Sequence, residues 1–250
     1  MTINTDINIL GGLPDWKLIY VFLNEDLKTI LSAGGSRSVT TIKTDKSVMR
    51  FEHAITNTLL TFKTEDIESL FRSIIKAEEI SADSLLFMFW NASLNNDLLH
   101  YINDKLFFPA LYSGRVSIKV DEASACINEL KQTQSDLKKW SDVTVNTTAS
   151  KYLTLLKKFG LLDGSVHKTI NHLNINDKMF VVFIYWLISA SEGSNLLNSP
   201  WINYGFTEIQ IFIQRIMQKK FNKYFNIMYT GDKLTVEPLI SYNEIYNHAY

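Results

Sequence analysis

Apolar residues recur at spacings of three and four along most of this 250-residue chain. That spacing places apolar side chains on one face of an α-helix, whereas a half-buried strand alternates at every second residue. The pattern continues from Trp16–Leu31 near the beginning to Asn176–Ser191. We therefore expect an all-α, multi-helical protein, with at most a small sheet near residues 161–173 and 229–239.

The most apolar stretch, Met179–Ile188, is too short to cross a membrane. It spans about half of the roughly twenty apolar residues that a bilayer requires, so we interpret it as a buried helix. Cys126 is the only cysteine, which excludes a disulfide within the chain. Residues Met1–Asp6 lack the charged region and apolar run of a secretory signal. These features predict a cytoplasmic protein without a membrane partner.

Apolar residues become sparse near 132–146, and we place a domain boundary there. We expect a helical N-terminal domain at 1–135 and a second domain at 136–250, with one compact unit as the alternative. Residues 1–136 carry 13 Lys/Arg against 18 Asp/Glu, whereas residues 137–250 carry 12 against 8. This asymmetry is a weak indication that the second half faces a polyanion, and ordinary surface variation is the alternative.

No catalytic constellation is recognisable in the sequence. His167 and His172 are five residues apart, whereas zinc ligation from one helix face uses a spacing of four beside a glutamate. The pairs Gly11–Gly12 and Gly34–Gly35 lack the spacing of a dinucleotide-binding motif and the lysine of a P-loop. We therefore predict a protein that is not an enzyme and that has no metal site and no cofactor.

Two basic segments are candidates for binding nucleic acid. The first surrounds the expected beginning of the second helix and combines hydroxyl groups, glycines and cations. Backbone amides and short hydroxyl side chains position phosphates, and cations neutralise them. The alternative interpretation is a polar loop that caps a helix. The candidate residues of this segment are Arg37, Ser38, Lys43 and Arg50.

The second basic segment contains a helix that we expect from Thr147 to Phe159. One face of this helix is apolar, and its opposite face carries Thr148 and several lysines. Such a helix, followed by the turn Asp163–Gly164, is similar to a recognition helix and the start of a wing. An ordinary amphipathic surface helix shows the same pattern, and the residues alone favour that simpler interpretation. The candidate residues of this segment are Lys138, Lys139, Lys151, Lys157 and Lys158.

Several short motifs follow one another in a recognisable order. They are Gly11–Gly12, Ser36–Lys43, the aromatic-rich Leu85–Trp90, Leu106–Phe108, and Trp140 with Thr147, Lys151 and Gly160–Leu162. In this order, and from roughly Gly11 to Asp163, the chain resembles the BrxA family of bacterial BREX phage-defence systems. The start of the second helix holds fewer arginines than the family pattern, which implies fewer phosphate contacts there.

The resemblance implies a small, non-enzymatic, helical protein that is similar in part to NusB and associated with nucleic acid. We accordingly expect a NusB-like N-terminal domain and a helical or winged-helix-like C-terminal domain. The implied function is a non-catalytic BREX component that binds DNA, or RNA, with little sequence preference.

The alternative function is an adaptor that assembles the defence-system proteins without binding nucleic acid directly. Other BREX proteins would be its partners. A helix expected from Thr207 to about Met228 would supply the contact surface. Its aromatic residues are Phe212, Phe221, Tyr224 and Phe225. The alternative is that the apolar face of this helix belongs to the core, which is the commoner outcome for such a face.

Overall fold

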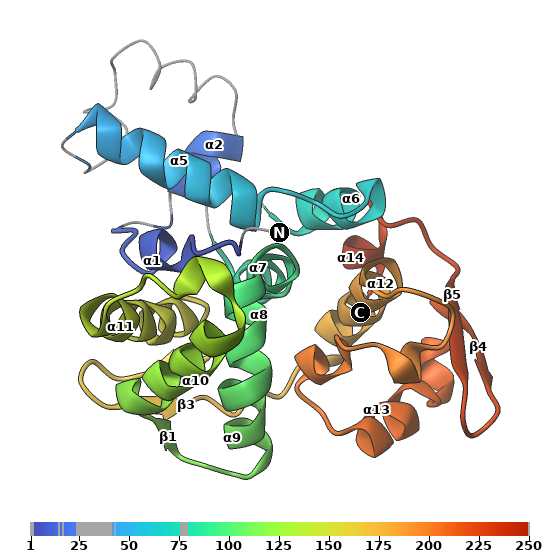
Figure 1. The fold of residues 1–250 in the computed structure, drawn as a ribbon. Helices are drawn as coiled ribbons and strands as arrows, with labels where there is room; N and C mark the ends of the chain where they lie inside the picture. Colours follow the sequence, from blue (N-terminus) through green and yellow to red (C-terminus); the bar gives the residue numbers. More distant parts are fainter. Residues whose placement is uncertain are drawn as a thin grey trace. The chain divides into compact units, whose positions relative to one another are not determined.

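The computed structural model describes residues 3–14, 16, 18–23, 42, 44–75 and 80–249 (Figure 1). Within these residues the chain is mostly helical, as predicted. The described residues also form five short strands, so the fold is not purely all-α. Four of these strands lie near the two places where the sequence predicted a small sheet, and the fifth, at residues 117–118, was not predicted.

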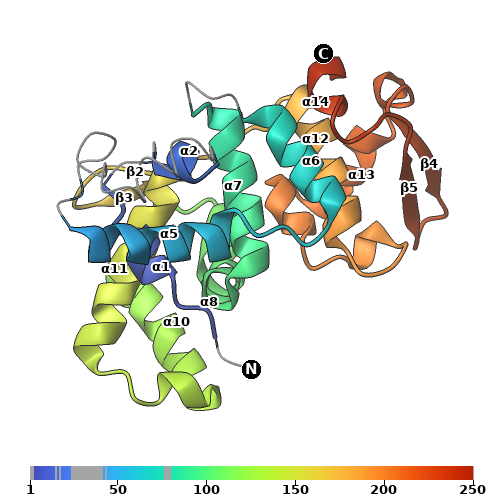
Figure 2. The ribbon, with the colours of Figure 1, turned by 90° about the horizontal axis from the view of Figure 1, so that it is seen from above.

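The chain forms two compact units. Unit 1 comprises residues 1–61 and 85–172, and unit 2 comprises residues 62–84 and 173–250. The expected boundary at 135/136 falls inside unit 1, between two helices that pack against each other (Figure 2). The sparse apolar residues near 132–146 therefore mark a connection between two helices rather than a boundary between compact units.

Unit 1 is mostly helical within the described residues. Its helices are α1 (Ile7–Leu10), α2 (Leu18–Leu23), α5 (Asp45–Leu59), α7 (Ala82–Asn95, mostly in unit 1), α8 (Asp97–Ile102), the π-helix η2 (Asn103–Phe107), α9 (Phe108–Tyr112), α10 (Val120–Thr133), the 3-10 turn η3 (Ser135–Leu137) and α11 (Asp142–Lys158). Its strands are β1 (Ser117–Ile118), β2 (Leu162–Asp163) and β3 (Lys168–Ile170).

A buried hydrogen-bond network fixes α11 against the core of unit 1. Asn103 is fully buried in η2, where its Nδ2 donates to Ser93 Oγ at 3.1 Å. The hydroxyl of Tyr152 on α11 donates to Asn103 Oδ1 at 3.0 Å. Because both ends of the amide have partners, this polar side chain is tolerated in the core. The network thereby sets which face of α11 remains exposed.

Unit 2 is built around the apolar helix α12 (Asp177–Ala190), which confirms the helix predicted at Asn176–Ser191. Asn176 caps it, since its Oδ1 accepts from the Met179 amide at 2.8 Å. Helix α12 packs against α6 (Glu65–Ile74) and α14 (Ile245–His248). Among the described residues, no helix is both long enough and apolar enough to cross a membrane.

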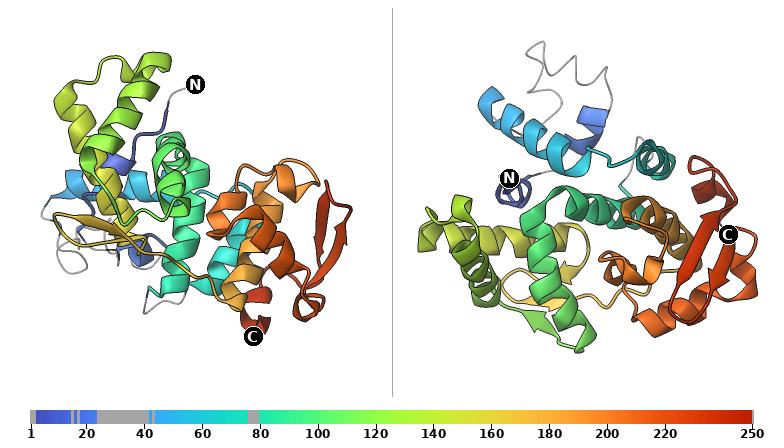
Figure 3. Two further views of the ribbon diagram at one scale, coloured as in Figure 1. Left: turned by 90° about the horizontal axis from the view of Figure 1, so that it is seen from below. Right: turned by 45° about the vertical axis from the view of Figure 1, so that its right-hand side comes forward.

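The prediction of one continuous helix from Thr207 to Met228 is wrong. Helix α13 (Ile209–Ile216) is followed by the 3-10 turn η6 (Lys219–Phe221) and by β4 (Phe225–Tyr229), which pairs with β5 (Leu234–Pro238) (Figure 3). Two further 3-10 turns, η4 (Leu196–Asn198) and η5 (Ile202–Gly205), precede α13. The four aromatic residues of this region are buried, which confirms the alternative that they belong to the core rather than to a contact face: Phe212, Phe221, Tyr224 and Phe225.

Candidate nucleic-acid interface

Residues 117–170 combine a pair of helices with a three-stranded antiparallel sheet. Strand β1 precedes α10, and the hairpin of β2 and β3 follows α11. Strand β3 lies in the middle, because it pairs with β2 on one side and with β1 on the other. This is the arrangement of a winged helix-turn-helix. Helix α11 takes the position of the recognition helix, and the β2–β3 hairpin takes that of the wing.

Local sequence features set both ends of this arrangement. Ser141 caps α11, because its Oγ accepts from the Thr144 amide at 3.2 Å. The helix therefore begins at Asp142, five residues before the predicted Thr147. Gly164 turns the hairpin at a φ of 84°, where a Cβ would lie 2.1 Å from the His167 carbonyl oxygen. Only glycine fits there without strain.

The accessible face of α11 carries a stripe of mostly short side chains at alternating spacings of four and three. These residues are Val143, Thr147, Ser150, Thr154 and Lys157. Ser150 and Thr154 line a groove of about 310 Å³, whose other walls are residues 117–120 and 165–168. The groove therefore lies between the recognition helix, the wing and the beginning of α10.

Two lysines line this groove. Lys119 is exposed at the beginning of α10, and Lys168 lies on the wing. The Nζ atoms of Lys157 and Lys168 both donate to the Gly164 carbonyl oxygen, at 2.9 and 3.2 Å. Partial burial and, secondarily, the charge of Lys157 lower the pKa of Lys168 from its ordinary value. The shared carbonyl holds two positive charges at the turn of the wing.

Only one of the three lysines predicted on α11 lies beside the groove. Lys158 Nζ instead donates to the main-chain carbonyls of Leu10 and Gly11, at 3.2 and 3.1 Å, and to that of Leu13. Lys151, seven residues earlier, also packs against Gly11. Lys157 lies one residue away from Lys158 and is rotated about 100° around the helix, toward the wing.

The prediction that Thr148, Lys151 and Lys158 share an exposed face was therefore wrong. Thr148 is fully buried, and its Oγ1 donates to the Thr144 carbonyl oxygen at 2.8 Å. Lys151 and Lys158 are only partly exposed, because α1 packs against their side of α11.

The other predicted residues are dispersed. Lys138 and Lys139 are exposed in the connection between α10 and α11. Arg50 is exposed on α5, whose beginning is capped by Thr44. The remaining three candidates, Arg37, Ser38 and Lys43, lie outside the described residues.

The sequence did not reveal Lys119 and Lys168 as part of one site. Strand β1 is only two residues long, which is too short for an alternating pattern. Its pairing joins residues about fifty positions apart, Ile118 and Lys168. The signal that was present is the run from Gly164 to Lys168, in which a turn glycine is followed by polar and basic residues.

The described residues form a mostly helical protein, in which residues 117–170 have the order of helices and strands found in a winged helix-turn-helix. A family model described as BrxA matches residues 22–184, which is more than half of the chain and includes α11 and the wing. The chain belongs to the BrxA family, a component of BREX phage-defence systems, as its motifs predicted. No curated protein and no solved structure matches it.

Proposed function

We propose that this BrxA-family protein is a non-catalytic, cytoplasmic component of a BREX system that binds DNA with little sequence preference. The observation that supports this proposal is the winged helix-turn-helix, whose recognition helix and wing border one cation-lined groove. An α-helix fits the major groove of B-form DNA, whereas the major groove of A-form RNA is too deep and narrow for it. The geometry therefore favours double-stranded DNA.

The side chains on the exposed stripe of α11 argue for weak sequence preference. Base recognition in the major groove relies mainly on paired hydrogen bonds from arginine, asparagine or glutamine. The stripe instead carries Thr147, Ser150, Thr154 and one lysine beside Val143. The exposed asparagine next to it, Asn146, already accepts a hydrogen bond from Ser124 on α10. Short hydroxyl groups and lysines suit phosphate contacts, which position a protein on the duplex without reading its sequence.

Neutralising the two cations that flank the groove is expected to weaken binding to unrelated duplexes equally. For Lys119→Gln with Lys168→Gln we expect affinity to fall on the order of tenfold at moderate salt. The slope of log affinity against log salt should become shallower by about one unit for each lost contact. Mobility-shift titrations at several salt concentrations measure both quantities. A matched double variant, Lys105→Gln with Lys233→Gln, should leave affinity and slope unchanged.

Three other outcomes contradict parts of the proposal. No shift at low salt with micromolar wild-type protein would favour the adaptor. A shift confined to one sequence would indicate a specific regulator. Full binding by the groove variant would show that DNA is held elsewhere, for example by Arg50, Lys138 and Lys139 or by the undescribed candidates Arg37, Ser38 and Lys43.

One observation favours the adaptor as a second candidate function. A groove of about 530 Å³ in unit 2 runs along β4 and β5. It is lined in part by Met217 and Leu239, whose exposed fractions are 48% and 58%. Exposed methionine and leucine side chains in a groove are typical of protein-binding surfaces. Another BREX protein would be the partner, and a NusB-like N-terminal part remains a prediction for either function.

A further inference from the structure

Unit 2 carries a separate group of cations around the beginning of α12. Lys178, Lys220 and Lys223 line one small pocket of about 50 Å³ together with Asp177. Lys219, which precedes Lys220 in the turn η6, is exposed. Three lysines from two separate segments of the chain therefore line one pocket, and a fourth adjoins them in sequence. None of them was among the nucleic-acid-binding candidates that the sequence suggested.

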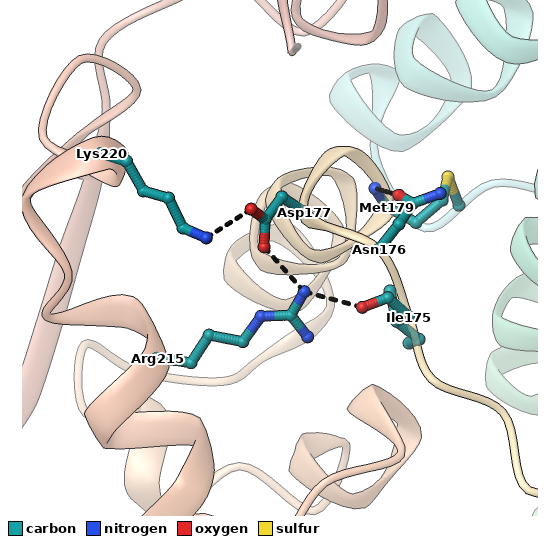
Figure 4. A network of polar contacts seen from close by, with 6 residues as sticks. All are labelled: Ile175, Asn176, Asp177, Met179, Arg215 and Lys220. Carbon is teal, nitrogen blue, oxygen red and sulfur yellow. Dashed lines mark hydrogen bonds and ion pairs between the residues drawn. The ribbon is translucent and has the colours of Figure 1, made fainter.

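The carboxylate of Asp177 in this group already accepts hydrogen bonds from two cationic side chains (Figure 4). Arg215 donates to Asp177 Oδ1 at 2.9 Å and to the Ile175 carbonyl oxygen at 2.7 Å, and Lys220 donates to Asp177 Oδ2. The hydrogen bond from Lys220 is the largest influence that lowers the pKa of Asp177 below its ordinary value. Asp177 is therefore ionised at neutral pH and balances only part of the surrounding positive charge.

Three of the lysines lie over aromatic rings, one of them Lys220, whose Nζ is 5.1 Å from the centre of the Phe221 ring. Lys178 Nζ lies 3.6 Å from the centre of the Tyr246 ring, and Lys223 Nζ lies 4.7 Å from that of Tyr224. Both rings are buried, so they cannot shift easily. A ring face attracts the ammonium group and leaves its remaining N–H groups directed elsewhere. Asp83 is a further carboxylate nearby, but it accepts a hydrogen bond from the Tyr246 hydroxyl at 2.9 Å.

We propose that Lys178, Lys219, Lys220 and Lys223 form a second phosphate-binding surface that contacts the nucleic-acid backbone. This inference goes beyond the winged-helix groove and rests on the proposal that the protein binds nucleic acid. The aromatic rings of this surface are buried and its ammonium groups lie over them, so a ligand would be bound mainly through charge rather than through apolar contact. Lysine, as a compact point charge, suits phosphates and carries no sequence information.

The test replaces Lys219 and Lys223, which, unlike Lys220, form no ion pair with a described carboxylate. For Lys219→Gln with Lys223→Gln in the full chain, we expect duplex affinity to fall on the order of tenfold at moderate salt. The salt slope should become shallower by about two units. A matched control, Arg72→Gln with Lys233→Gln, removes the same charge from unit 2 and should bind like the wild type.

A second measurement tests this surface independently of the winged-helix groove. Lysine acetylation of the wild type, mapped by mass spectrometry, should show Lys219 and Lys223 protected by a duplex, whereas Lys233 should not be protected. Unchanged binding and no protection, while the groove variant loses affinity, would overturn this inference and leave the proposed function intact. The reverse result would support this surface and overturn the groove.

Two outcomes would reject nucleic acid as the ligand of this surface. Binding of the wild type to vesicles containing phosphatidylserine, with the same lysine dependence and no shift of any duplex, would assign it to lipid headgroups. A wild type that binds no duplex at low salt and shows no protected lysine would overturn both proposals.

Discussion

Replacing Gly11 by alanine is expected to lower the melting temperature of unit 1 by about 5–10 °C. Gly11 lies where the end of α1 meets α11, and an added Cβ would be 2.4 Å from the Lys151 carbonyl oxygen. That oxygen belongs to the backbone in the middle of a helix, so it cannot move without displacing α11. Forced overpacking of this kind costs up to about 3 kcal/mol. Differential scanning calorimetry measures the change.

Gly12 provides the matched control. A Cβ there would lie 3.3 Å from the Ile9 carbonyl oxygen and 3.4 Å from Lys151 Nζ, which is the end of a flexible side chain. Gly12→Ala should therefore change the melting temperature much less. Equal losses in both variants, or no loss in Gly11→Ala, would show that the contact between α1 and α11 is not the constraint.

Replacing Lys158 by methionine is expected to destabilise unit 1 by about 2 kcal/mol. Methionine keeps the length and apolar character of the side chain, but it leaves the carbonyls of Leu10, Gly11 and Leu13 without their donor. Urea denaturation measures the loss. Lys157→Met is the control, because its hydrogen bond to Gly164 is exposed and water can replace it. Similar losses in both variants would contradict the structural role of Lys158.

The contribution of Lys158 should also depend on pH. Burial, and secondarily the charge of Lys151, lower the pKa of Lys158 from 10.5 to about 8. Between these two values the unfolded chain binds more protons than the folded protein, so stability rises with pH. The wild type should gain stability relative to Lys158→Met as the pH rises above about 8. A difference that stays constant from pH 7 to 10 would contradict this assignment.

Lys158 also shows that helical periodicity predicts a helix and its buried face but does not predict which polar residues stay accessible to a ligand. The spacing of Tyr152, Leu155, Leu156 and Phe159 predicted the helix and its buried face. It could not predict that α1, about 150 residues earlier, covers one side of the polar face. If the proposed function holds, a charge reversal at Lys158 would reduce DNA binding by unfolding the protein rather than by removing a phosphate contact.

The helix expected after Thr207 failed for a related reason. The aromatic spacing in that region is compatible with helix and with strand, so the pattern alone does not decide between them. The decisive interaction is the pairing of β4 with β5 across the turn at Gly231, whose φ is 94°. Pairing depends on both strands together, whereas a helix is determined by its own segment. Most helices and the two places with a small sheet were therefore predictable, whereas the ends of the strands and their pairing were not.

The division of unit 2 into two distant stretches of chain has a consequence during synthesis. The apolar face of α6, formed by Ile67, Leu70, Phe71 and Ile74, packs against α12 and α14. Helix α12 begins only at Asp177, about one hundred residues later. At about 5–20 residues per second, the ribosome needs roughly 5–20 s to deliver it. During that interval the apolar face of α6 is exposed in the nascent chain, and we expect a chaperone to bind at residues 65–74.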